Sequence, residues 1–144
     1  MEKRFVTEIR VIYGDTDAMG VAYHANYLRW FEIGRTELIR DLGFSYSQIE
    51  KYPVWLPITH AHVEYKKPAV YDDVILVSSH IAELGFASML LNYEITNKES
   101  GELLVSGYTR HGITDDKLKP IKLKRAYPEL YKALSAIAAD SDSK

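Results

Sequence analysis

The amino-acid sequence predicts a single α+β domain in which one long helix packs against a twisted antiparallel sheet. Three observations support this class. Residues 25–42 repeat apolar side chains at helical spacing, and three long runs after residue 74 alternate as strands do. The separators between those runs are short, as in an antiparallel meander. With 144 residues, 47% of them hydrophobic, the chain is long enough for one such domain, residues 1–144, and short for two.

The N-terminal part is expected to hold a strand, a loop and the long helix, in that order. Residues 5–13 alternate and predict a strand, whereas residues 14–20 break the alternation and predict a loop. One stripe of the helix is formed by Tyr27, Phe31, Gly34, Leu38 and Leu42. Because Gly34 lowers helix propensity, we expect it to let the helix lie close to the sheet. Gly43 is placed to end the helix in a left-handed turn.

The rest of the chain is rich in strand patterns. Ser45 and Gln48 have the spacing of a capping box, which predicts a short second helix ending near Pro53. Strands are predicted at residues 58–65, 74–83, 86–96 and 103–113. After them we expect a basic linker at residues 117–125, a helix around residues 127–138 and a frayed tail at residues 140–144.

Composition and charge exclude several classes of function. A formal net charge of -2 provides no basic field for nucleic acid or an anionic membrane. The absence of cysteine excludes disulfides, thiolate metal sites and a cysteine nucleophile. No apolar run approaches the roughly 20 residues of a membrane-spanning helix, and no signal peptide is visible after Met1. We therefore expect a cytoplasmic protein.

The most informative stretch is residues 13–27, just before the predicted helix. It contains Asp15, Asp17, Gly20 and His24. A helix start carries N–H groups without partners and the positive end of the helix dipole, so it suits an oxygen that is gaining negative charge. A carboxylate held beside such a start can act on a carbonyl bound there. A carboxylate and a helix start are the minimum that acyl transfer or hydrolysis needs in the absence of a serine or cysteine nucleophile.

The same stretch resembles a known family. The motifs DTDAxGVxYHANY at residues 15–27 and FExxRTE at residues 31–37 are similar to those of hotdog-fold acyl-CoA thioesterases, in the 4-hydroxybenzoyl-CoA thioesterase branch. A second block, residues 63–74, also matches, and the likeness covers about residues 10–128. It implies the hotdog fold, a five-stranded antiparallel sheet wrapped around the long helix. It also implies subunits that pair edge to edge.

The resemblance implies hydrolysis of an acyl-CoA thioester to a free acid and coenzyme A, with no metal and no cofactor beyond the coenzyme A of the substrate. The family's catalytic aspartate falls on Asp17, and the backbone N–H that holds the thioester oxygen falls on His24. Asp17 would act as a general base or as a nucleophile, and the sequence leaves both roles open. Its structural alternative is to cap a turn or the helix. The residues predicted to bind substrate are Gly20, Tyr23 and Asn26.

Two other functions stay open: a hotdog-type dehydratase of hydroxyacyl thioesters, and a non-catalytic acyl-binding protein. The thiol of the substrate is coenzyme A or an acyl-carrier protein. The candidates for binding the phosphates of coenzyme A are Lys66, Lys67 and the basic linker. The bend at residues 85–88, which is basic in some family members, has no cation here.

His60 and His62 share one face of a predicted strand, but no third ligand has fitting spacing, so we predict no metal. Some predicted strands carry apolar residues on both faces, for example at residues 90–91 and 103–105. One helix covers only one face of a sheet. The surplus predicts a homo-oligomer, either a dimer or a tetramer.

Overall fold

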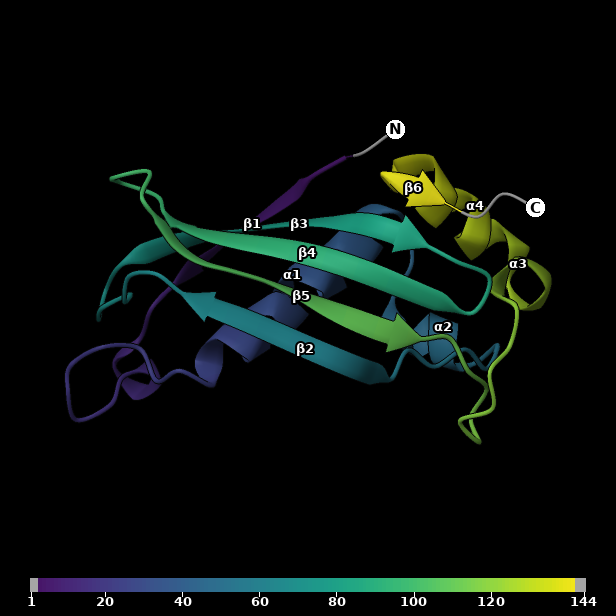
Figure 1. Cartoon of the computed structure of the whole chain (residues 1–144), viewed down its shortest axis with the longest axis horizontal. Helices are drawn as coiled ribbons and strands as arrows, with labels where there is room; N and C mark the ends of the chain where they lie inside the picture. The colour runs from purple at the N-terminus through teal and green to yellow at the C-terminus, as the bar shows by residue number, and fades with distance from the viewer. Residues whose placement is uncertain (1–2, 142–144) are drawn as a thin grey trace.

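The structure is a computed structural model that describes residues 3–141. Its main element is a sheet of five antiparallel strands in the order β1-β3-β4-β5-β2, to which the two residues of β6 add a short parallel pairing with β3 (Figure 1). The strands are β1 (Phe5–Arg10), β2 (Ile58–Tyr65), β3 (Val74–Leu84), β4 (Ser88–Asn97), β5 (Leu103–Gly112) and β6 (Asp140–Ser141). The predicted class, five antiparallel strands around a long helix, is confirmed, and β3, β4 and β5 form the predicted meander.

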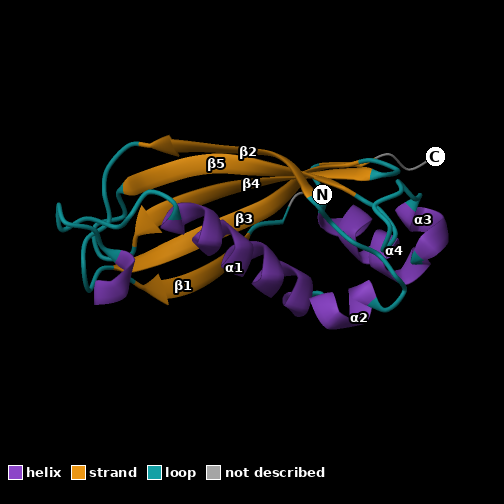
Figure 2. Cartoon of the chain, turned by 90° about the horizontal axis from the view of Figure 1, so that it is seen from below, coloured by secondary structure: helices purple, strands orange, loops and turns teal. Residues whose placement is uncertain are grey.

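The long helix α1 (Asn26–Asp41) lies across one face of this sheet (Figure 2). Its buried stripe includes Phe31, whose ring stacks on Tyr93 of β4 with the centroids 4.2 Å apart. A Cβ atom at Gly34 would lie 2.8 Å from Cγ1 of Val77 in β3, so the predicted close approach of helix and sheet is confirmed. Gly43 has the expected left-handed conformation, with φ of +94°.

The remaining helices are short and lie near one end of the sheet (Figure 1). Helix α2 (Tyr46–Glu50) begins with the predicted capping box between Ser45 and Gln48. Helices α3 (Leu123–Ala126) and α4 (Pro128–Ile137) follow the last long strand. No helix in the described part of the chain has the length and apolar character needed to cross a membrane.

The structure differs from the sequence-based expectations in three places. Strand β1 ends at Arg10, and the expected loop contains a 3₁₀ turn, η1 (Tyr13–Asp15). Part of the expected basic linker forms helix α3. The expected frayed tail begins with the ordered strand β6, which pairs with β3, while residues 142–144 lie outside the described part.

Strand β2 forms one border of the sheet. Among the described residues it pairs only with β5, and all of its residues except Val63 are exposed. The surplus of apolar residues on the strands is smaller than expected, because Leu91, Leu104 and Val105 are already buried within the single chain. A homo-oligomer therefore stays a prediction, and the free edge of β2 becomes its main support.

Candidate active site

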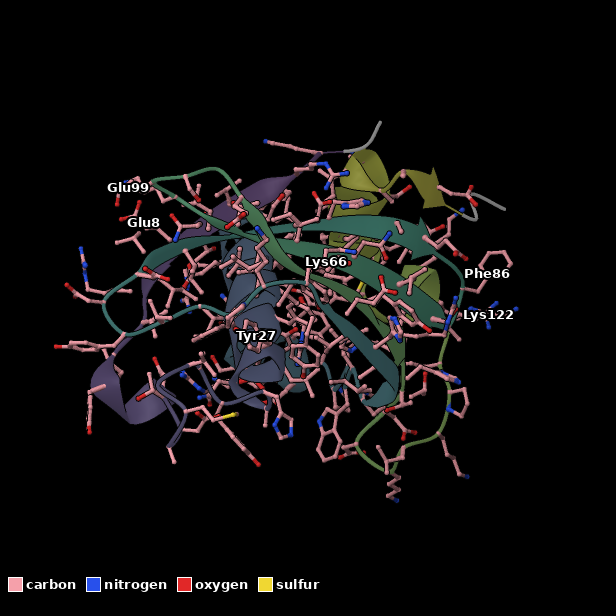
Figure 3. All side chains as sticks on the ribbon, turned by 60° about the vertical axis from the view of Figure 1, so that its left-hand side comes forward. Glu8, Tyr27, Lys66, Phe86, Glu99 and Lys122 are labelled. Atoms are coloured by element: carbon pink, nitrogen blue, oxygen red, sulfur yellow. The ribbon has the colours of Figure 1, made fainter. Side chains whose placement is uncertain are left out.

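A cavity of about 280 Å³ opens where the loop before α1, the first turn of α1 and the end of β2 meet. It is lined by Asp17, Met19, Val21, Ala22, His24, Tyr27, Tyr65, Lys66, Lys67 and Pro68. The two residues predicted to carry catalysis, Asp17 and His24, thus share one cavity. Figure 3 shows Tyr27 and Lys66, which contribute to its wall from α1 and from the segment after β2.

Asp17 is half-buried in a tight turn of the loop. Its carbonyl accepts a hydrogen bond from the N–H of Gly20 at 2.9 Å, and Gly20 allows the turn by adopting φ of +81°. Oδ1 of Asp17 accepts from the N–H of Met19 at 2.8 Å. Within residues 3–141, Oδ2 has no hydrogen bond and no ion pair. The carboxylate therefore caps the turn with one oxygen while the other is available to a ligand.

His24 lies two residues before α1. Its backbone N–H, like that of Ala25, donates to no other described residue. Its carbonyl accepts a hydrogen bond from the hydroxyl of Tyr65 at 2.8 Å. The imidazole lies against the ring of Tyr23, with the centroids 4.4 Å apart. Two backbone donors that have no partner within residues 3–141 thus precede a helix of 16 residues, where the helix dipole adds positive potential.

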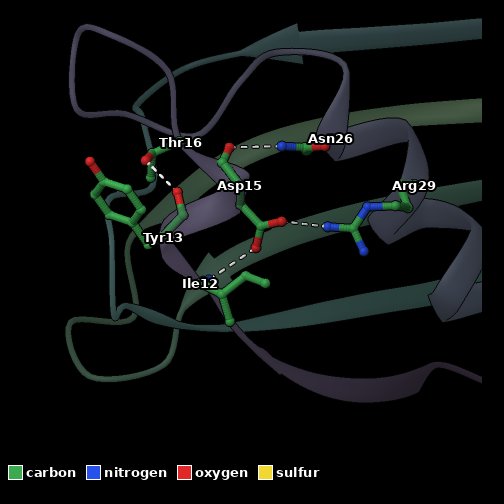
Figure 4. A network of polar contacts seen from close by, with 6 residues as sticks. All are labelled: Ile12, Tyr13, Asp15, Thr16, Asn26 and Arg29. Carbon is green, nitrogen blue, oxygen red and sulfur yellow. Dashed lines mark hydrogen bonds and ion pairs between the residues drawn. The ribbon is translucent and has the colours of Figure 1, made fainter.

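A polar network fixes this loop to the helix (Figure 4). The buried carboxylate of Asp15 accepts from Arg29 at 2.7 Å and from the N–H of Ile12 at 3.0 Å. The carbonyl of Asp15 accepts from the side-chain amide of Asn26 at 2.7 Å and from the N–H of Tyr23 at 2.8 Å. Both ends of the loop are therefore held by one residue, Asp15.

The three residues predicted to bind substrate lie around the cavity but do not line it in the single chain. Gly20 is exposed at the turn, and Tyr23 is 47% exposed beside His24. The Asn26 side chain is engaged with Asp15. Their role in substrate binding stays a prediction.

Sequence reasoning missed Tyr65 as part of this site. Tyr65 ends β2, and its hydroxyl contacts a residue 41 positions earlier in the chain. The available signal was an aromatic residue directly before the bend at residues 66–68. Of the two lysines in that bend, Lys67 forms an ion pair with Glu102, and Lys66 has no ion pair within the described residues.

A second cavity, of about 500 Å³, is lined by Phe86, Lys122, Lys124 and Arg125, and we call it the basic cavity. The N–H of Leu123 donates to the carbonyl of Phe86 at 3.0 Å, which brings the linker against the bend between β3 and β4. The ammonium of Lys122 lies 5.7 Å from the centre of the Phe86 ring. The bend at residues 85–88 has no cation of its own, but Lys122, Lys124 and Arg125 lie against it. This bend is at the end of the sheet opposite the Asp17 loop (Figure 1).

The histidines of β2 lie away from both cavities. The ring of His60 hydrogen-bonds with the hydroxyl of Thr59, and that of His62 stacks on Tyr108. Within residues 3–141, no three histidine or acidic side chains are grouped as metal ligands would be. The absence of a metal from the reaction stays a prediction.

Comparisons with known proteins agree with the geometry. Residues 11–134 match the model of the family described as the thioesterase-like superfamily. The chain is 41% identical over 127 residues to the Bacillus subtilis (strain 168) protein named "Putative acyl-CoA thioesterase YneP", covering 88% of this chain and 91% of that protein. It is 32% identical over 136 residues to acyl-CoA thioesterase YbgC of Haemophilus influenzae, covering 92% of this chain and 95% of that one.

A solved structure with a very similar fold is a DHNA-CoA thioesterase from Staphylococcus aureus. The superposition has a TM-score of 0.88 and 38% sequence identity, and it covers 93% of this chain and 90% of the other.

Proposed function

The chain belongs to the thioesterase-like superfamily, and we propose from this membership and from its site that it hydrolyses acyl-CoA thioesters to a free acid and coenzyme A. One observation carries the proposal: Asp17, whose Oδ2 has no partner within residues 3–141, shares a cavity with His24, whose backbone N–H at the start of α1 donates to no described residue. The names of similar proteins, among them acyl-CoA thioesterases, support the same activity.

In the proposed reaction the thioester carbonyl lies at the helix start, and its oxygen accepts from the N–H of His24. As the carbonyl carbon becomes tetrahedral, the oxygen gains negative charge, which the N–H and the helix dipole stabilise. Asp17 acts in one of two ways. As a general base it takes a proton from the attacking water, and as a nucleophile it forms a mixed anhydride that water then hydrolyses. In both routes the C–S bond breaks, the thiolate leaves and takes up a proton, and one water is consumed.

We further propose a two-fold dimer formed along the free edge of β2, which is supported by the exposure of that strand. Antiparallel pairing of two β2 edges would bring the Ile58 end of the partner beside the Tyr65 end of this chain. The basic cavity of the partner, at the bend between its β3 and β4, would then lie three to four strand spacings from this β2, about 14–19 Å away. The pantetheine arm of coenzyme A has the length of about four extended residues, about 14 Å. We therefore propose that the partner's basic cavity holds the phosphates.

The first test is a thiol-release assay with aromatic, short-chain and long-chain acyl-CoA substrates. We expect Asp17→Asn to keep the melting temperature and to lose turnover a hundredfold or more. Asp116→Asn, a change of the same kind at an exposed loop position, should behave as wild type. Full activity of Asp17→Asn would refute the role of Asp17. An enoyl thioester among the products would indicate a dehydratase, and binding without thiol release would indicate an acyl-binding protein.

The second test concerns the phosphates and the dimer. Replacing both Lys122 and Arg125 with alanine should raise KM for acyl-CoA about three- to tenfold and leave KM for an acyl-N-acetylcysteamine thioester unchanged. The control removes Lys51 and Lys132, two exposed cations outside the basic cavity, and should change neither value. Light scattering should give a mass twice the 16.5 kDa of the chain. A monomer that hydrolyses acyl-CoA at full rate would refute the dimer arrangement.

A further inference from the structure

We propose that Tyr65 is a positioning residue for thioester hydrolysis: its hydroxyl holds the peptide between His24 and Ala25 so that the backbone donors at the start of α1 face the reacting oxygen. This inference rests on the proposed function, since it assigns a role within the same site. A residue from the sheet thus takes part in stabilising the oxyanion, which would otherwise depend on the helix start alone.

The contacts of Tyr65 join the end of a strand to the start of the helix. Its hydroxyl donates to the carbonyl of His24 at 2.8 Å. Its ring packs edge to face against Tyr27, with the centroids 5.4 Å apart, and Tyr27 is buried. The strand end is itself anchored, because the N–H groups of Lys66 and Lys67 both donate to the carbonyl of Leu104. The backbone next to Tyr65 is therefore held in place, and its side chain extends from there to the start of α1.

The bonded carbonyl and a neighbouring free donor belong to the same peptide group. The carbonyl is that of His24, and the N–H on the other side of the peptide bond is that of Ala25, which donates to no other described residue. A hydrogen bond accepted by a peptide carbonyl polarises the peptide and strengthens its N–H as a donor, by about 10–30% in condensed phase. The same bond anchors the backbone of His24 itself, so the His24 N–H, the donor proposed for the substrate oxygen, needs no reorientation when charge develops there.

The hydroxyl must stay protonated to donate. Partial desolvation raises the pKa of Tyr65 above the ordinary value for tyrosine, so the group is neutral throughout the working range of a hydrolase near neutral pH. Tyr65 lines the same cavity as Asp17 and His24. A purely structural role would use the ring, which packs against Tyr27, and would not need the hydroxyl.

The test compares Tyr65→Phe with Tyr71→Phe. Both variants remove one hydroxyl from an exposed tyrosine at the same end of the sheet, but the hydroxyl of Tyr71 has no hydrogen bond within residues 3–141. The assay follows thiol release from benzoyl-CoA, with melting temperatures measured in parallel. We expect Tyr65→Phe to lower kcat about tenfold, a fraction of the loss that follows removal of a direct donor. KM and the melting temperature should stay close to wild type, as should all values for Tyr71→Phe.

A second measurement does not depend on turnover. In the amide NMR spectrum the Ala25 proton should move upfield in Tyr65→Phe, since its peptide loses the bond at the carbonyl. An unchanged kcat, a rise in KM alone, or an unmoved Ala25 signal would each overturn the positioning role. Absence of thiol release by the wild type would instead overturn the proposed function, so the two failures are distinguishable.

Discussion

Replacing Arg29 with methionine tests whether the network around Asp15 holds the loop that carries Asp17 and His24. The side chain of Asp15 is only 8% exposed and its partner Arg29 is 49% exposed. A hydrogen bond to a charged group contributes about 1.5–3 kcal/mol. We expect Arg29→Met to lower the free energy of unfolding by the lower limit of this range, about 1.5 kcal/mol, because water can reach the half-exposed Arg29. For a domain of this size the melting temperature should fall by about 3–6 °C. Because the loop also carries Asp17 and His24, kcat should fall more than the folded fraction does.

The assay is urea unfolding of a double-mutant cycle with Asp15→Asn, at fixed protein concentration, together with thiol-release kinetics. Arg29→Met should lower the free energy of unfolding much less in the Asp15→Asn background, because the buried charge is gone. Arg40→Met is the matched control on the same helix. Its ion pair with Glu37 is exposed on both sides, so its loss should cost less than about 0.5 kcal/mol. A coupling energy between Asp15 and Arg29 below about 0.3 kcal/mol would refute the reasoning.

Two further predictions concern stability. A Cβ atom at Gly107 would lie 2.2 Å from the backbone carbonyl of His62, so Gly107→Ala should lower the free energy of unfolding in urea by about 3 kcal/mol or more. The control Gly14→Ala, with open space around it, should be nearly neutral. Burial, and to a lesser extent the charge of Arg35, lowers the pKa of His111 below 6.5. The unfolded chain therefore binds a proton first, and stability should be complete above about pH 6.5 and fall below it by up to about 1.4 kcal/mol per pH unit. His111→Gln should reduce the change in the free energy of unfolding with pH below about 6.5. An equal change in the variant would contradict the assignment of this pH dependence to His111.

Local patterns predicted most of the secondary structure. The helical stripe, the alternation of the long strands and the capping box at Ser45 each depend on residues close together in the chain, and each is confirmed. The close approach at Gly34 was also predictable, because a glycine inside a helix needs a reason to be there. The 3₁₀ turn η1 and helix α3 were missed, since segments of three and four residues are too short to show a period.

The site was only partly predictable, for a different reason. Asp17 and His24 lie seven positions apart on one loop, and the motif indicated both. Tyr65 and the basic cavity depend on contacts between segments far apart in the chain, such as that of Leu123 with Phe86. Hydrophobic periodicity reports which face of an element is buried, but not which distant element lies against it. The fold was needed to show that a bend without basic residues is nevertheless surrounded by cations.

The two interpretations of Asp17, as a turn cap and as a catalytic group, do not compete in this structure. The bond from the N–H of Met19 to Oδ1 fixes the plane of the carboxylate. It also leaves Oδ2 as the oxygen that can meet water or the thioester carbon. A carboxylate without the cap would rotate freely and would have to be ordered during the reaction. The structural role of Asp17 is therefore a condition for its proposed chemistry, and the turn around Gly20 serves the reaction by holding one oxygen in place.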